Sequence, residues 1–113
     1  MIIIKEKISI NKLKETVKEM FDNMVKAVVD IEDKTIAVGG ELHSDEEALL
    51  LENGSKQQNL WGINLYYDIA DDSWIEFDSM INLRPSQGNR TRNVDNPEIR
   101  KKIIEIVNNL IER

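Results

Sequence analysis

A chain of 113 residues, 41% of them hydrophobic, is long enough to bury one core without disulfides or metals, so we expect a single domain over residues 1–113. It has no cysteine and one histidine, which excludes disulfides, cysteine-bound metals and any site that needs two histidines. The formal net charge of −6 argues against general nucleic-acid binding. No apolar run is long enough for a signal peptide or a membrane span, so we expect a soluble cytoplasmic protein without membrane attachment. No residue pattern predicts a cofactor or a metal site.

The hydrophobic patterns predict eight elements in the order β-α-β-β-α-β-β-α. Their expected positions are a strand at Ile2–Ile4, a helix capped by Ser9 or Asn11 and closed by Asp22 and Asn23, strands at Val25–Ile31 and Thr35–Val38, a short helix that starts at Ser44, strands at Leu60–Tyr67 and Trp74–Arg84, and a helix that starts at Pro97. Hairpin connections outnumber crossovers, which is typical of antiparallel pairing. We therefore predict an α+β fold, with a mostly antiparallel sheet of about five strands packed on two longer helices and one short helix.

The two longer helices each show an apolar stripe at helical spacing. In the first helix the stripe is Leu13, Val17, Met20, Phe21 and Met24. In the last helix it is Ile99, Ile103, Ile106, Val107 and Leu110. Asn96 is the expected cap of the last helix, with Pro97 at its first position. Because Ile104 and Ile111 widen this apolar face, and Trp61–Tyr67 is rich in aromatics, we predict a homodimer.

The segment Trp74–Arg84 alternates strictly and predicts one long strand at the centre of the sheet. Its expected inward residues are Ile75, Phe77, Ser79, Ile81 and Leu83. Its expected outward residues are Trp74, Glu76, Asp78, Met80, Asn82 and Arg84. Pro85 cannot donate to a strand ladder, so the strand should end there, and Gly88 allows the following loop to turn with positive φ.

The loop over residues 84–92 combines three arginines, two hydroxyls and a glycine turn, the groups that phosphate and carboxylate sites use. The candidate ligand-binding residues are Arg84, Ser86, Gly88, Asn89, Arg90 and Arg92, together with Asn82 and Glu76 of the preceding strand. The alternative is structural. Arg84 would then pair with Glu76 or Asp78, while Arg90 and Arg92 would tie the loop to the acidic helix.

A second candidate site follows the glycine pair Gly39–Gly40, where Glu41 and His43 come directly after a strand. His43 with Glu41 as its base could serve acid–base catalysis, with the arginine loop as an anion clamp. The two candidate sites would share one edge if the strand Thr35–Val38 lies beside Trp74–Arg84. The alternative is that His43 and Ser44 cap the short helix and the acidic residues face water.

Three runs of the sequence show a resemblance to a known family. They are Ala-Val-Gly-Gly-Glu-Leu-His-Ser-Asp at residues 37–45, Leu-Trp-Gly-Ile-Asn at 60–64, and Trp-Ile-Glu-Phe-Asp-Ser-Met-Ile-Asn-Leu-Arg-Pro-Ser-Gln-Gly-Asn-Arg-Thr-Arg at 74–92. Over its full length the chain resembles a family of small bacterial and archaeal proteins catalogued only as a domain of unknown function. Residues 41–44 also resemble a fragment of the JAB/MPN zinc metalloprotease pattern, but Asp45 replaces the second histidine, which removes that metal site.

These observations leave three functional hypotheses. The leading one is a protein that binds an anionic small molecule, or an acidic segment of a partner, where the turn at residues 39–45 meets the arginine loop. The second is a hydrolase-type enzyme that uses His43 and Glu41. The third is an interaction module that acts as a homodimer.

Overall fold

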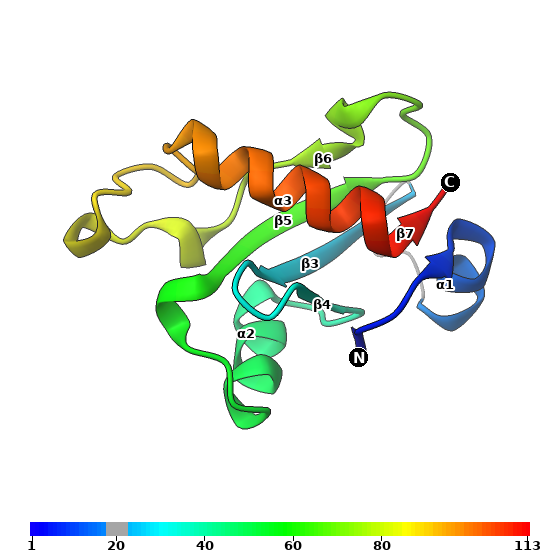
Figure 1. Cartoon of the computed structure of the whole chain (residues 1–113), viewed down its shortest axis with the longest axis horizontal. Helices are drawn as coiled ribbons and strands as arrows, with labels where there is room; N and C mark the ends of the chain where they lie inside the picture. The colour runs from blue at the N-terminus through cyan, green and yellow to red at the C-terminus, as the bar shows by residue number, and fades with distance from the viewer. Residues whose placement is uncertain (18–22) are drawn as a thin grey trace.

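The computed structural model describes residues 1–17 and 23–113, and it has the predicted α+β class (Figure 1). A five-stranded antiparallel sheet has the order β1-β4-β3-β5-β6, and a short parallel pair joins β2 to β7. The strands are β1 (Ile2–Ile4), β2 (Ile8–Ser9), β3 (Met24–Asp30), β4 (Thr35–Val38), β5 (Leu60–Tyr66), β6 (Ile75–Glu76) and β7 (Ile111–Glu112). The helices are α1 (Ile10–Thr16), α2 (His43–Glu52) and α3 (Pro97–Leu110), with single 3-10 turns at Gln57–Asn59, Asp72–Trp74, Met80–Asn82 and Pro85–Gln87.

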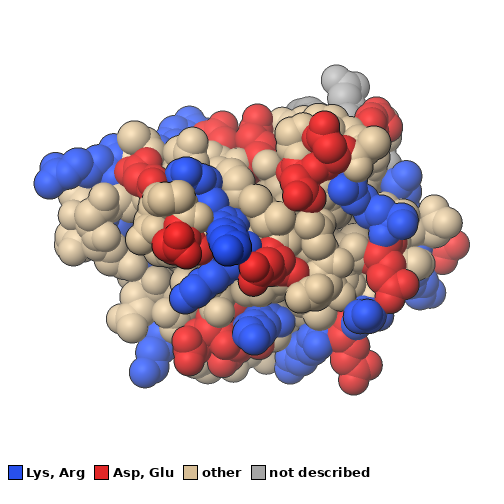
Figure 2. All heavy atoms as spheres, turned by 45° about the horizontal axis from the view of Figure 1, so that its top comes forward, with Lys and Arg blue, Asp and Glu red and all other residues tan. Residues whose placement is uncertain are grey.

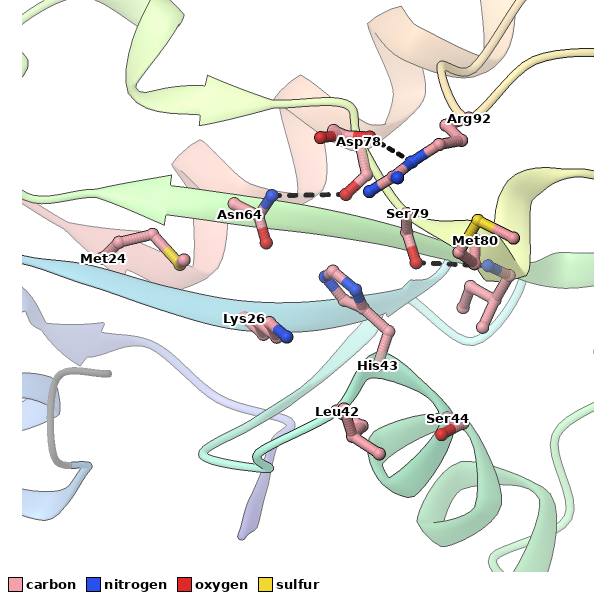
Figure 3. Close-up of a pocket in the computed structure, with 11 residues that line it drawn as sticks. Met24, Lys26, Leu42, His43, Ser44, Asn64, Asp78, Ser79, Met80 and Arg92 are labelled. Carbon is pink, nitrogen blue, oxygen red and sulfur yellow. Dashed lines mark hydrogen bonds and ion pairs between the residues drawn. The ribbon is translucent and has the colours of Figure 1, made fainter. Parts of the chain in front are cut away.

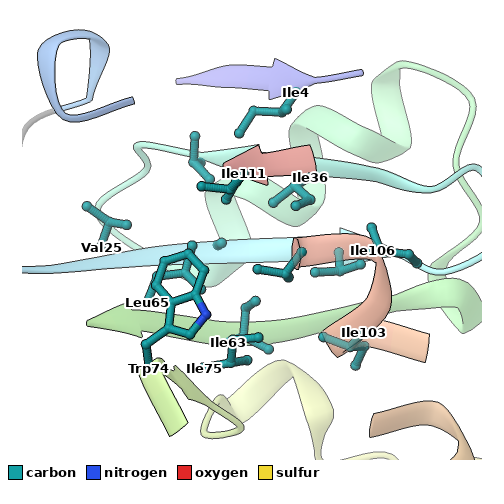
Figure 4. Packing of buried hydrophobic residues seen from close by; sticks show 14 of the residues in the cluster. Ile4, Val25, Ile36, Ile63, Leu65, Trp74, Ile75, Ile103, Ile106 and Ile111 are labelled. Atoms are coloured by element: carbon teal, nitrogen blue, oxygen red, sulfur yellow. The ribbon is translucent and has the colours of Figure 1, made fainter. Parts of the chain in front are cut away.

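The sheet is covered on both faces, by α3 on one side and α2 on the other (Figure 1). Because side chains alternate along each strand, neighbouring residues of β3 and β5 enter different cores. The larger core lies under α1 and α3 and holds Val25, Ala27, Val29, Ile63, Leu65 and Ile103 among others (Figure 4). The smaller core lies under α2 and holds Val28, Ala37, Leu50 and Leu60. The α2 side has less apolar packing, which leaves room for polar groups.

The β3–β4 hairpin and the last helix form as predicted. The carboxylate of Asp30 accepts the backbone N–H groups of Glu32 and Asp33 at 2.9 and 3.0 Å, which fixes the turn between the two strands. The Asn96 side chain caps α3 by accepting the N–H of Glu98 at 2.8 Å, and Pro97 takes the first helical position.

The first helix begins at the predicted cap, where Ser9 accepts the N–H of Lys12 at 3.1 Å. The helix ends at Thr16, because Val17 is its C-cap with extended backbone, so the prediction of Val17 and Met24 as helical positions is wrong; Met24 starts β3. The predicted helical positions Met20 and Phe21 lie outside the described residues.

The two apolar residues that motivated the prediction of a homodimer, Ile104 and Ile111, pack within the chain itself. Ile111 leaves α3, enters β7 and is buried against the larger core, where Ile104 is partly buried as well. The homodimer therefore stays a prediction without this support. In the part of the chain that the structure describes, no helix is long and apolar enough to cross a membrane.

The long strand predicted at Trp74–Arg84 is wrong, because only Ile75 and Glu76 pair with β5. Beyond that point β5 is paired by side chains instead of backbone. The Asn82 amide accepts the Gly62 N–H at 2.8 Å and donates to the Gly62 carbonyl at 2.9 Å, and Arg84 donates to the Leu60 carbonyl. These contacts satisfy the edge of β5 without a strand, so the local alternation did not determine the backbone.

The predicted faces of this segment change as a result. Trp74 and Asn82, expected on the outward face, are fully buried, whereas Leu83, expected inside, is 42% exposed. Phe77 and Ile81 are half-buried and pack against different cores, on opposite sides of the sheet. Strands β3 and β5 also separate β4 from β6, so the shared edge proposed for the two candidate sites does not exist.

Candidate functional site

A cavity of about 230 Å³ lies on the α2 side of the sheet (Figure 3). Its floor is formed by β3 and β5, one wall by the start of α2, and the other by the segment that follows β6. The lining residues are Met24, Lys26, Leu42, His43, Ser44, Asn64, Asp78, Ser79, Met80, Ile81 and Arg92. The cavity therefore combines charged groups, amides and an apolar rim.

The glycine pair before α2 sets the position of this wall. Gly39 has φ +92°, which favours glycine, and a Cβ on Gly40 would lie 2.8 Å from the Cγ of Glu46. The Gly40 N–H donates to the Glu46 carboxyl oxygen Oε2 at 3.0 Å. Glu46 is fully buried, and burial raises its pKa to about 9, so it is protonated and neutral at pH 7. The glycine turn and helix α2 are thus joined by a hydrogen bond to the buried, neutral carboxyl group of Glu46.

The cap residue of α2 is Leu42, which has no side-chain oxygen to satisfy the first amides. Asp45 and Glu46 donate their N–H groups to the Leu42 carbonyl, but the amides of His43 and Ser44 find no acceptor among the described residues. The hypothesis that His43 and Ser44 side chains cap this helix is therefore wrong. The positive end of the helix dipole lies at the cavity wall.

His43 is half-buried, and its ring bonds to the carbonyl of Ile63 at 2.8 Å. Because a carbonyl only accepts, Nε2 must carry the hydrogen, and Nδ1 holds the lone pair of the neutral ring. Burial lowers the pKa of His43 and the Lys26 charge adds to this, against the opposing effects of Ile63, Asn64 and Asp78. The imidazole is therefore neutral at pH 7.

Lys26 and Asn64 face each other across β3 and β5, directly opposite in the register. The Asn64 Nδ2 donates to the Glu76 carboxylate at 2.8 Å and to the Asp78 carbonyl at 3.2 Å. Its Oδ1 is buried and has no hydrogen-bond partner. Lys26 is half-buried, and its side-chain ammonium forms no hydrogen bond or ion pair with any described residue.

Arg92 is the only one of the predicted loop arginines that lines the cavity. Its Nε lies 2.7 Å from the carboxylate of Asp78, and both side chains are about half exposed at 56% and 45%. Ser79 is buried next to them and accepts the N–H of Ile81 at 3.3 Å.

Arg84, by contrast, is bound inside the fold. It donates to the carbonyls of Gln57 at 2.6 Å and Leu60, and its guanidinium stacks 4.1 Å from the centre of the Trp61 ring. The predicted pairing of Arg84 with Glu76 or Asp78 is wrong, since backbone carbonyls occupy its donors. Arg84 therefore holds the loop to β5.

Asn89 organises the rest of the loop from a buried position. Its Nδ2 donates to the carbonyls of Asn82, Thr91 and Asn93, and its Oδ1 accepts the N–H of Asp95 at 2.7 Å. The two Nδ2 hydrogens are shared among three carbonyls and Oδ1 is bonded as well, so this buried amide holds the loop together. Asn82 is likewise occupied by Gly62 and the Arg92 carbonyl.

The structure thus brings together two of the predicted site residues, His43 and Arg92, and places Glu76 beside them through Asn64. The others do not line this cavity: Glu41, Arg84, Ser86, Gly88, Asn89, Arg90 and Asn82. Glu41 is exposed, and Gly88 takes the predicted positive φ of +79° at the end of a 3-10 turn. Across residues 1–17 and 23–113, no three acidic or histidine side chains come together as a possible metal site.

Lys26 and Asn64 were not among the site residues predicted from the sequence. A usable signal existed, because each is a polar residue inside an otherwise apolar strand, in Met-Val-Lys-Ala-Val-Val and in Leu-Trp-Gly-Ile-Asn-Leu. Two such interruptions opposite each other in a hairpin-rich sheet indicate a polar spot on one face.

Residues 2–110 match a family described as "Protein of unknown function (DUF5674)". Comparisons with curated proteins and with solved structures gave no match. The family match spans almost the whole chain and confirms the predicted resemblance. The chain therefore belongs to the DUF5674 family of proteins of unknown function.

Proposed function

We propose that this protein binds a small anionic molecule in the cavity between α2, β3 and β5. The observation that supports this most strongly is Lys26, a half-buried residue on the cavity floor whose ammonium has no partner among the described residues. A charge withdrawn from water without compensation is unfavourable, and a bound anion supplies the missing partner.

The surroundings of Lys26 do not supply that compensation. Glu46 is an acid whose pKa responds to Lys26, but burial keeps it protonated at pH 7. Asp78 also lines the cavity, and its carboxylate is paired with Arg92. A ligand anion therefore meets one uncompensated positive charge.

The start of α2 adds a second source of attraction. The amides of His43 and Ser44 have no acceptor in the described part of the chain, and the helix dipole places partial positive charge there. Leu42 and Met80, 54% and 63% exposed, stand at the rim and provide apolar contact for the rest of the ligand.

A small molecule fits these features better than an acidic partner segment does. Figure 2 shows Lys and Arg interspersed with Asp and Glu on one face of the molecule, and among the residues that line the cavity the basic ones are Lys26 and Arg92, of which Arg92 is paired with Asp78. A hydrolase is less favoured because the His43 ring is bonded to a backbone carbonyl and Glu41 lies outside the cavity lining.

The test compares Lys26→Gln with Lys101→Gln. Both variants remove one positive charge, and Lys101 is an exposed residue of α3, on the other side of the sheet. Wild type and Lys101→Gln should gain thermal stability with phosphate, acetate or succinate, and Lys26→Gln should not. Equal shifts in all three proteins, or no shift in any of them, would reject the proposed site.

A further inference from the structure

The amide of Asn64 gives information about the ligand beyond its charge. Both groups that contact its Nδ2, the Glu76 carboxylate and the Asp78 carbonyl, are acceptors. A flipped amide would place Oδ1 against two acceptors, so the orientation of the side chain is fixed. Oδ1 must therefore point the other way.

Figure 3 shows that Oδ1 of Asn64 points into the cavity, toward His43 and Lys26. Asn64 is only 6% exposed, and Oδ1 has no hydrogen-bond partner. The His43 ring donates to Oδ1 only in its charged form, which the lowered pKa disfavours; in the neutral ring the single N–H is used by Ile63. A buried carbonyl oxygen in this state requires a donor from outside the chain.

The cavity floor therefore has two neighbouring side chains that need ligand groups of opposite kinds. Lys26 and Asn64 are directly opposite in the β3–β5 register, and Cβ atoms of such pairs lie about 4.5 to 5.5 Å apart. Lys26 requires an acceptor with negative charge, and Asn64 requires a donor. The Nδ2 of the same amide donates to the Glu76 carboxylate, and such a charged bond polarises the amide and makes Oδ1 a stronger acceptor, which favours a positively charged donor.

We infer that the ligand is a small zwitterion, an α-amino acid with an apolar side chain. Its carboxylate lies at Lys26 and the free amides of α2, and its ammonium donates to Oδ1 of Asn64. The side chain contacts the apolar lining formed by Met24, Leu42, Met80 and Ile81. The inference rests on the proposed anion site and adds the donor that distinguishes this ligand from a simple carboxylate.

The size of the cavity is consistent with this class. At about 230 Å³ it is smaller than the roughly 300 to 1,000 Å³ of pockets for drug-sized ligands. In an α-amino acid the ammonium and the carboxylate are attached to the same carbon. Such a molecule of a few heavy atoms can therefore reach Lys26 and Asn64 at the same time.

The experiment uses three molecules that differ by one group. L-leucine carries both charges, 4-methylpentanoate lacks the ammonium, and 3-methylbutylamine lacks the carboxylate. Titration calorimetry at pH 7 should show leucine binding at least about ten-fold more tightly than 4-methylpentanoate, the loss expected for one hydrogen bond from a charged donor, and no binding of the amine.

The outcomes separate the inference from the proposed function. If 4-methylpentanoate binds as tightly as leucine, the zwitterion is rejected and the anion site stands. If leucine, valine, isoleucine, methionine and phenylalanine all fail to bind while phosphate or succinate binds through Lys26, the inference is again rejected alone. If no anion binds, both are rejected.

Asn64→Ala gives an independent test of the residue. The preference for leucine over 4-methylpentanoate should fall toward one in this variant, because the group that recognises the ammonium is gone. Asn108→Ala is the matched control, since Asn108 is an exposed amide of α3 that bonds Asp72, and the preference should persist there. A preference that persists in Asn64→Ala would overturn the role of Asn64, and the three-ligand series decides the inference if that variant fails to fold.

Discussion

Two polar regions of this protein differ in how completely their groups are paired. In the arginine loop, residues 84–95, the buried amide of Asn89 is hydrogen-bonded through both Nδ2 and Oδ1, and Arg84 is bound to two carbonyls and a tryptophan ring, with its Nε as the one buried side-chain atom left without a partner there. On the cavity floor, Lys26 and Oδ1 of Asn64 have no partner among the described residues. Because buried polar groups are nearly always satisfied, we assign the largely paired region to the fold and propose the ligand site at the less paired one.

The comparison also shows how composition can mislead. The loop contains the residue types of an anion site. Most of its hydrogen-bonding groups, however, bind backbone groups of β5 or of the loop itself. The cavity floor has fewer polar residues, contributed by neighbouring strands whose proximity no sequence motif reveals.

The largest expected effect is in the loop. Asn89→Ala removes three donated bonds and one accepted bond from a buried position, and should lower the free energy of unfolding by about 2 to 4 kcal/mol. Urea denaturation measures this. Arg90→Ala is the control, because that side chain is exposed, and it should stay within about 0.5 kcal/mol of wild type. Equal midpoints for the two variants would mean that Asn89 does not organise the loop.

The next effect concerns Glu46 and depends on pH. The folded protein holds its pKa near 9, above the ordinary value of 4.5, so the folded state binds the proton more tightly than the unfolded state. Stability should therefore fall as pH rises through this window, by up to about 1.4 kcal/mol per pH unit from this group.

Glu46→Gln isolates this contribution because the amide remains neutral at every pH. The variant should gain stability relative to wild type between pH 5 and pH 8, by roughly 1 to 3 kcal/mol. Chemical denaturation at both pH values measures the difference. A difference that does not change with pH would show that the buried carboxyl titrates normally.

The sequence was sufficient for the parts of the fold with strong periodicity and local caps. Asn96 and Pro97 predicted the start of α3, and the hydrophobic pattern predicted strands close to β3 and β4. The α+β class followed from the order of these elements. Each of these features depends on interactions close in sequence.

The segment after Trp74 could not be predicted in the same way. Its alternation is genuine, but Asn82 and Arg84 satisfy β5 with side chains, and Gly62 permits this because a Cβ there would lie 2.5 Å from the Cβ of Ser79. Such contacts join residues about 20 positions apart, and local patterns do not encode them. The same reason explains why His43 and Arg92 were named as candidates while Lys26 and Asn64 were not.

A smaller effect separates two arginines of the same loop. Arg84→Ala removes two bonds to carbonyls and the stack on Trp61, and should cost about 1 to 2 kcal/mol. Arg92→Ala breaks one half-exposed ion pair with Asp78, and should cost less than about 1 kcal/mol. Denaturation midpoints measure both losses. A larger loss of stability in Arg92→Ala than in Arg84→Ala would contradict this prediction.

The smallest expected effect is a change in the titration of His43, the single histidine, whose NMR signals are therefore unambiguous. Its pKa should lie below 6.5, chiefly because burial disfavours the charged ring. Since the folded pKa is lowered, the contribution of this group to stability is present above pH 6.5 and is lost as pH falls below that value. Lys26→Gln should move the pKa upward, because the Lys26 charge helps to lower it, and a bound anion should do the same by offsetting that charge. Lys101→Gln should leave the titration unchanged. An unperturbed midpoint in wild type would mean that the ring is open to water and that the cavity wall built on its bond to Ile63 is not formed.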